Sequence, residues 1–123
     1  MYFCFNMTSL SNTEVLKEIK IILEKSKIDI LGGLKKCCHF LKENISHFDW
    51  VGFYFANFHT KNLNLKAFSG KPTDHTTIPF GSGICGQVAL SNKNFMVPNV
   101  REQDNYIACN LDVKSELVVP LFI

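Results

Sequence analysis

The chain has 123 residues, 46% of them hydrophobic, and its 13 basic and 11 acidic side chains give a net charge of +2. This length supports one domain at most, with a core large enough to fold without disulfide bonds, and the near balance of charge argues against nucleic-acid binding. The opening stretch MYFCFNM lacks the basic and apolar regions of a signal peptide, and no apolar run approaches the ~20 residues of a membrane span, so we expect a cytoplasmic protein with no membrane partner.

Two amphipathic helices are predicted in the N-terminal half. Ser11 opens the stretch SNTE, a capping box typical of a helix start, and apolar residues follow at helical spacing over residues 15–23. The same spacing predicts a second helix over residues 30–45. We expect residues 1–11 to form a mobile N-terminus ahead of the first helix.

Strand patterns dominate the rest of the chain. WVGFYFAN is rich in aromatic and β-branched residues and predicts a strand, and LNLKAFSG predicts its hairpin partner across the polar turn FHTKN. The Gly-, Pro- and Thr-rich stretch GKPTDHTTIPFGSG predicts a loop, ICGQVALSNK a helix of about two turns, and FMVPNV a short strand. REQDNYIACNLDVK predicts a polar loop that leads to the apolar strand SELVVPLFI.

The order of these elements predicts an α+β domain in which helices flank an antiparallel sheet. The final stretch SELVVPLFI is almost wholly apolar, and such a strand normally lies inside a sheet with neighbours on both sides. A strand left at the edge would expose unpaired backbone groups. We therefore expect the domain to be truncated at its C-terminus, with a last strand and helix missing.

The stretch FGSGICGQVA carries Gly81, Gly83 and Gly86 in the G-x-G-x-x-G pattern of dinucleotide-binding loops. In that fingerprint a strand precedes the glycines, a long helix follows, and an acidic residue lies about 20 positions further on. Here a loop precedes them, the predicted helix is short, and Glu102 lies in a polar loop. The pattern is more typical of a tight turn whose glycines adopt positive φ.

The cysteines form no C-x-x-C pair and are odd in number, so we expect no metal site and no disulfide framework. Cys85 stands where a short helix begins, and the free N–H groups of a helix start stabilise a thiolate. Cys109 lies in a loop before the last strand, and such loops often carry chemistry. For both thiols, simple burial is the alternative. Cys37, Cys38 and His39 are consecutive in a helix and point about 100° apart, so we expect them to be structural.

Two positions in the strands also attract attention. Alternation puts Trp50, Gly52 and Tyr54 on one face, and two aromatics around a glycine predict a notch for a small apolar or cationic group. Core packing is the alternative for these aromatic residues. Glu116 opens the last apolar strand, where a carboxylate either guards the sheet edge or binds the ammonium group of a free amino acid.

Five motifs, WVGFYF, IPFGSGICGQVA, VPNV, NYIACN and SELVVPLF, occur in this order along the chain. Taken together they resemble the GAF-domain free methionine-(R)-sulfoxide reductases, and the resemblance runs from about Asn12 to the end. It implies a single GAF-like domain over residues 1–123, with an antiparallel sheet flanked by helices.

The resemblance also implies a role for each candidate site residue. The cysteine of the I-A-C motif is the catalytic nucleophile in the family and falls on Cys109, and the cysteine of the G-x-C-G motif falls on Cys85. The aromatic pair of W-x-G-F-Y lines the sulfoxide pocket and falls on Trp50 and Tyr54. The substrate-binding glutamate of S-E-[IL]-V-V-P falls on Glu116.

The chain departs from the family in the stretch GKPTDHTTIP, where family members usually carry a third cysteine and this chain has Asp74 and His75. The family chemistry converts a thiol to a sulfenic acid, which a second thiol condenses to a disulfide, and an external dithiol such as thioredoxin then reduces it without a cofactor. With the usual partner absent, Cys85 becomes the candidate to resolve Cys109. His75 is a candidate proton donor, because imidazole titrates near neutrality.

Two other functions compete with free methionine-(R)-sulfoxide reduction. A GAF module without catalysis would bind a small molecule and signal through partners. A structural module would form a homodimer through its N-terminal helix, with a vestigial pocket.

Overall fold

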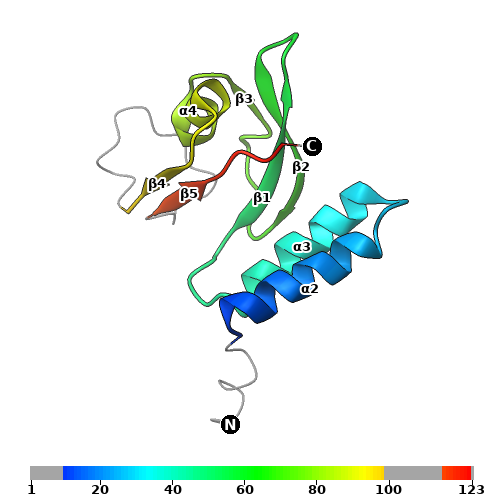
Figure 1. The fold of residues 1–123 in the computed structure, drawn as a ribbon. Coiled ribbons are helices and arrows are strands. Elements are labelled where there is room, and N and C mark those ends of the chain that lie inside the picture. Colours follow the sequence, from blue (N-terminus) through cyan, green and yellow to red (C-terminus); the bar gives the residue numbers. More distant parts are fainter. Residues whose placement is uncertain (1–9, 99–114, 123) are drawn as a thin grey trace. The chain divides into compact units, whose positions relative to one another are not determined.

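The computed structural model describes residues 10–98 and 115–122 (Figure 1). Its elements in chain order are α2 (Asn12–Glu24), α3 (Ile30–Asn44), β1 (Val51–Asn57), β2 (Asn62–Ser69), β3 (Thr77–Pro79), α4 (Gly83–Ser91), β4 (Phe95–Val97) and β5 (Glu116–Val118). The chain divides into two compact units, Met1–Phe53 with Lys66–Lys71, and Tyr54–Leu65 with Pro72–Ile123. Within the described ranges, every helix is too short or too polar to traverse a bilayer.

In the first unit, α2 and α3 pack side by side as a helical hairpin (Figure 1). The predicted cap of α2 is confirmed, because the Ser11 hydroxyl accepts a hydrogen bond from the backbone N–H of Glu14 at 3.2 Å. Asp29 caps α3 in the same way, accepting from the N–H of Gly32 at 3.0 Å. Both helices therefore begin where a side chain satisfies a backbone donor that has no partner within the helix.

A three-stranded sheet has the order β1-β2-β3, and β2 pairs with β3 antiparallel. The predicted loop between residues 70 and 83 is wrong in this respect, since β3 lies within it. Ile78 faces Leu63 across the pair, and both are buried. A three-residue strand with one buried position is too short to produce a visible alternation, so the surrounding Gly, Pro and Thr concealed it.

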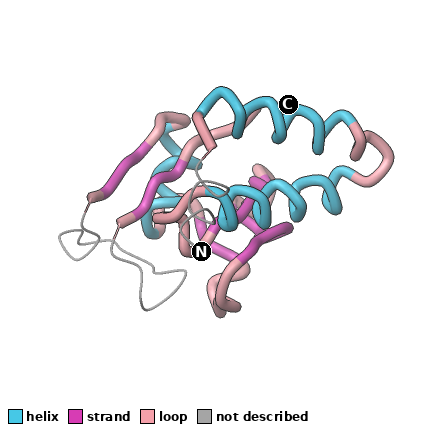
Figure 2. Tube along the Cα trace, turned by 90° about the horizontal axis from the view of Figure 1, so that it is seen from below, coloured by secondary structure: helices cyan, strands magenta, loops and turns pink. Residues whose placement is uncertain are grey.

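In the second unit, β4 and β5 form an antiparallel pair whose register joins Phe95 to Val118 and Val97 to Glu116 (Figure 2). The last strand is shorter than predicted, because only Glu116–Val118 is in strand conformation. Pro120 has no N–H to donate to a ladder, and this residue type ends strands. The α+β class with antiparallel sheets is confirmed.

The short helix α4 packs on this strand pair. Its Ile84 is 1% exposed and meets Val97, which is 2% exposed, with Phe95 and Val118 packed around them. Burial of such aliphatic side chains contributes roughly 1.5–3 kcal/mol each. This small apolar cluster fixes the start of α4 against β5, and it thereby positions the residues beside Ile84 and Val118.

Candidate functional site

The glycine-rich turn before α4 is a tight turn, as predicted. Gly81 and Gly83 have φ of +87° and +63°, values that glycine adopts without strain. The N–H of Gly81 donates to the carbonyl of Gly86 at 2.8 Å. A Cβ added at Gly86 would lie 2.6 Å from the carbonyl oxygen of Pro79, so the close approach of two backbone segments requires glycine here. The glycines therefore bring the turn back over the first turn of the helix.

Cys85 lies in the first turn of α4, in the position that the sequence predicts. The side chain is partly buried. Its Sγ donates a hydrogen bond to Oε1 of Glu116, with 3.7 Å between the two atoms. The structure thus joins two of the predicted site residues, which are 31 positions apart in the chain.

The partnership between Cys85 and Glu116 follows from the packing of α4 on β5. Glu116 and Val118 are two residues apart in a strand, so their side chains point to the same face. Val118 packs against the cluster of Ile84 and Val97, and Ile84 is the residue that precedes Cys85 in the helix. The carboxyl group of Glu116 is consequently directed toward the start of α4, not toward solvent at a sheet edge.

Glu116 is an unusual carboxyl group. Burial raises its pKa from 4.5 to about 7, although the hydrogen bond from Cys85 acts in the opposite direction. Its Oε2 atom is buried and has no hydrogen-bond partner in the part of the chain that the structure describes. A buried carboxylate oxygen without a donor is costly. Near neutral pH this group can therefore both hold a proton and accept one.

Tyr54 and His75 also belong to the second unit. The Tyr54 hydroxyl donates to the backbone carbonyl of His75 at 2.7 Å, which ties the loop before β3 to β1. The His75 N–H donates to Oγ1 of Thr73 at 3.1 Å, and the residue is exposed. These contacts engage the backbone of His75.

Trp50 lies in the first unit, just before β1. Its indole N–H donates to the carbonyl of Lys71 at 3.0 Å, and its ring stacks on Phe68 with 5.8 Å between centroids. The same ring covers Gly52, where an added Cβ would clash with it. The predicted notch above Gly52 is therefore wrong, because the indole itself fills that space.

The remaining cysteine predictions divide in two. Cys37 and Cys38 are buried at 2% and 0% exposure, and burial raises the pKa of both thiols, that of Cys38 to about 12. Their predicted structural role is confirmed, since thiols that stay protonated are inert. Cys109 lies outside the described residues, as does Cys4. Among residues 10–98 and 115–122, no three His, Cys, Asp or Glu side chains gather as metal ligands.

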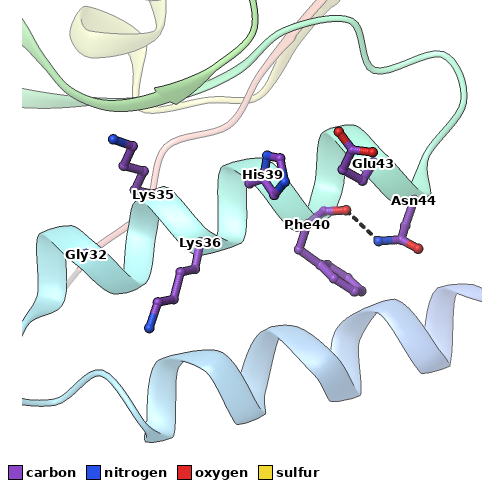
Figure 3. Close-up of a pocket in the computed structure, with 7 residues that line it drawn as sticks. All are labelled: Gly32, Lys35, Lys36, His39, Phe40, Glu43 and Asn44. Atoms are coloured by element: carbon purple, nitrogen blue, oxygen red, sulfur yellow. Dashed lines mark hydrogen bonds between the residues drawn. The ribbon is translucent and has the colours of Figure 1, made fainter.

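A separate hollow of about 550 Å³ runs along α3 (Figure 3). It is lined by Gly32, Lys35, Lys36, His39, Phe40, Glu43 and Asn44. Figure 3 shows Phe40 pointing toward α2, while Asn44 donates to the Phe40 carbonyl at 2.9 Å. None of the predicted site residues lines this hollow, which lies in the first unit.

No family model matches the sequence. The chain is 34% identical to a solved free methionine-R-sulfoxide reductase from Neisseria meningitidis, in complex with its substrate, over 94% of this chain and 70% of that one, with a TM-score of 0.83. The chain belongs to the GAF-domain free methionine-R-sulfoxide reductase family. A free methionine-R-sulfoxide reductase of Saccharomyces cerevisiae is 37% identical over 68% of this chain and 46% of its own length. A solved GAF domain has a TM-score of 0.79 at 27% identity, over 92% of this chain and 68% of its own.

Membership of the reductase family confirms the resemblance found in the motifs. The chain spans 46% to 65% of the length of the curated relatives it matches. The pairing of Cys85 with Glu116 is the feature that motif reading missed. No local signal could have revealed it, because each residue was recognised in its own motif and only the packing of α4 on β5 joins them.

Proposed function

We propose that the protein reduces free methionine-(R)-sulfoxide to methionine, with Cys109 as nucleophile and Cys85 as second thiol. Family membership supports this activity, because the Neisseria relative is a free methionine-R-sulfoxide reductase in complex with its substrate. The observation that carries the proposal is the buried Glu116 carboxyl group, 3.7 Å from the Cys85 thiol and with one oxygen unpartnered among the described residues. A polar substrate group would satisfy that oxygen.

In the proposed first step, the Cys109 thiolate attacks the sulfoxide sulfur while an acid protonates the sulfoxide oxygen. The oxygen transfers to Cys109, which becomes a sulfenic acid, and methionine leaves. Glu116 is suited to supply the proton, because burial raises its pKa to about 7 and keeps it partly protonated at neutral pH. His75 is the alternative proton donor. Because its side chain is exposed, it can be replaced in a separate variant.

In the proposed second step, Cys85 attacks the sulfenic acid, and a disulfide and water form. A dithiol protein such as thioredoxin then reduces this disulfide, so that no bound cofactor takes part. Cys85 takes over this role because Asp74 and His75 occupy the stretch where family members usually carry a third cysteine.

The test measures methionine released from free methionine-(R)-sulfoxide with dithiothreitol as reductant. We expect turnover by the full-length protein and none by Cys109→Ser. Cys4→Ser is the matched control and should retain full turnover. Unchanged methionine release by Cys109→Ser would contradict the proposed nucleophile, and unchanged release by His75→Ala would dismiss His75 as donor.

A second candidate is a GAF sensor that binds methionine sulfoxide without reducing it. The replacement of the usual third cysteine favours this function over the others that the sequence left open. A sensor would be stabilised against heat by methionine sulfoxide but would release no methionine. Stabilisation by RT ln(1 + [L]/Kd) reaches roughly 2.7 kcal/mol at a hundredfold excess over Kd, which thermal denaturation detects.

A further inference from the structure

The contact between Cys85 and Glu116 also bears on how a resolving thiol loses its proton. A neutral thiol is a poor nucleophile, so attack on a sulfenic acid requires that the proton leave as the S–S bond forms. Cys85 already donates its hydrogen to Oε1 of Glu116 at 3.7 Å. The other oxygen of the same carboxyl group is buried and has no partner among the described residues.

We propose that Glu116 is the base that accepts the proton of Cys85 when this thiol resolves the sulfenic acid on Cys109. This role rests on the proposed sulfoxide reduction and extends it to the second step. The Cys85 sulfur forms the S–S bond and is oxidised, while the S–O bond of Cys109 breaks and that sulfur is reduced. The proton passes from Cys85 to the carboxylate and then to the departing hydroxide, which leaves as water.

Among the described elements that pack most closely on β5, Cys85 is the side chain that can exchange a proton with Glu116. These elements are β4 and α4. The sequence of β4 is FMV and that of α4 is GICGQVALS, so Cys85 is the only titratable side chain on either element. The carboxyl group therefore exchanges a proton with Cys85 more readily than with any other group on these elements.

The first step of the proposed reaction would also leave Glu116 in the ionised form that the second step requires. If Glu116 gives its proton to the sulfoxide oxygen, it becomes a carboxylate just as Cys85 needs a base. One group then serves both half-reactions, as an acid in the first and as a base in the second. The thiol proton ends in the departing water, so the carboxylate regains its own proton from solvent before the next turnover.

The first experiment needs no methionine sulfoxide. The rate of alkylation of Cys85 by iodoacetamide is measured from pH 6 to 9 by peptide mass spectrometry, in the wild type and in Glu116→Gln. When the carboxylate of Glu116 accepts the thiol proton during attack, the rate follows the ionisation of Glu116, so it rises as this group loses its proton near pH 7 and then levels off. We expect the wild-type rate to rise less than about threefold between pH 7.5 and 8.5 and the Glu116→Gln rate to rise about tenfold.

Glu43→Gln removes an equal charge from an exposed site on α3 and should follow the wild type. Equal slopes in the wild type and Glu116→Gln would overturn the proposal. The wild-type profile alone is also decisive, since a steady tenfold rise per pH unit with no inflection contradicts an internal base even if the variant fails to fold.

The second experiment makes the sulfenic acid directly. One equivalent of hydrogen peroxide oxidises the Cys109 thiol to sulfenic acid and water, and disulfide formation with Cys85 is followed at pH 7. We expect Glu116→Gln to form the disulfide at least about tenfold more slowly, with Cys109 trapped instead by dimedone. Equal rates would overturn the proposal. Absence of methionine release by the wild type, with both results as expected, would refute sulfoxide reduction alone.

Discussion

Replacing Glu116 with glutamine should stabilise the protein at alkaline pH. Glutamine has the shape of the protonated acid and keeps an oxygen that can accept from Cys85. The wild-type carboxyl group has a pKa of about 7 in the folded chain, against an ordinary value of 4.5 when unfolding exposes it. A folded-state pKa above the unfolded one means that the folded state binds the proton more tightly.

The sign and size of the effect follow from this difference. The stability contributed by protonation is complete below pH 4.5 and is lost as the pH rises through 7. At 1.36 kcal/mol per pKa unit, the wild type should lose about 2.5 kcal/mol between pH 5 and pH 8 from this group. Glutamine does not titrate, so Glu116→Gln loses no stability from this position as the pH rises. The difference in unfolding free energy between the variant and the wild type should therefore change by about 2.5 kcal/mol between pH 5 and pH 8.

Urea denaturation at pH 5 and pH 8, followed by circular dichroism, measures this difference. Histidines and other carboxyl groups titrate alike in both proteins, so their contributions cancel. Glu43→Gln, at an exposed position, should show a difference from the wild type that does not depend on pH. A pH-independent difference for Glu116→Gln as well would refute the burial of this charge, and with it the argument for its acid–base role.

Three further predictions concern the frame of the site and the inert thiols. Gly86→Ala should lower the unfolding free energy measured in urea by about 1–3 kcal/mol, because its Cβ would press on the carbonyl of Pro79. An unchanged midpoint would disprove the close approach of Gly86 to Pro79. Tyr54→Phe should cost about 1 kcal/mol in the same assay through loss of its 2.7 Å bond to the His75 carbonyl, whereas a neutral result would mean that water replaces it. The Cys38 thiol, with a pKa raised by burial to about 12, should resist iodoacetamide at pH 8 until urea is added, and rapid labelling of the native protein would contradict its burial.

Local patterns in the sequence were sufficient for most of the elements. The cap at Ser11, the helical spacing of residues 30–45 and the aromatic strand WVGFYFAN each predict a structure that is present, because capping and periodicity act over a few residues. The short strand Thr77–Pro79 was not predicted, because a strand with a single buried residue shows no alternation of apolar and polar positions. The family resemblance likewise rested on motifs that can be read one at a time.

The sequence by itself determined the class of fold, the family and the residues worth testing. Only the tertiary structure decided what those residues contact. It laid the Trp50 ring over Gly52, where a notch was expected, and it joined Cys85 to Glu116 across 31 positions. The physical reason is that strand register and helix packing are set by contacts between distant segments. The apolar cluster of Ile84 and Val97, with Val118 packed against it, directs the carboxyl group of Glu116 toward the thiol of Cys85. No single stretch of sequence contains that arrangement.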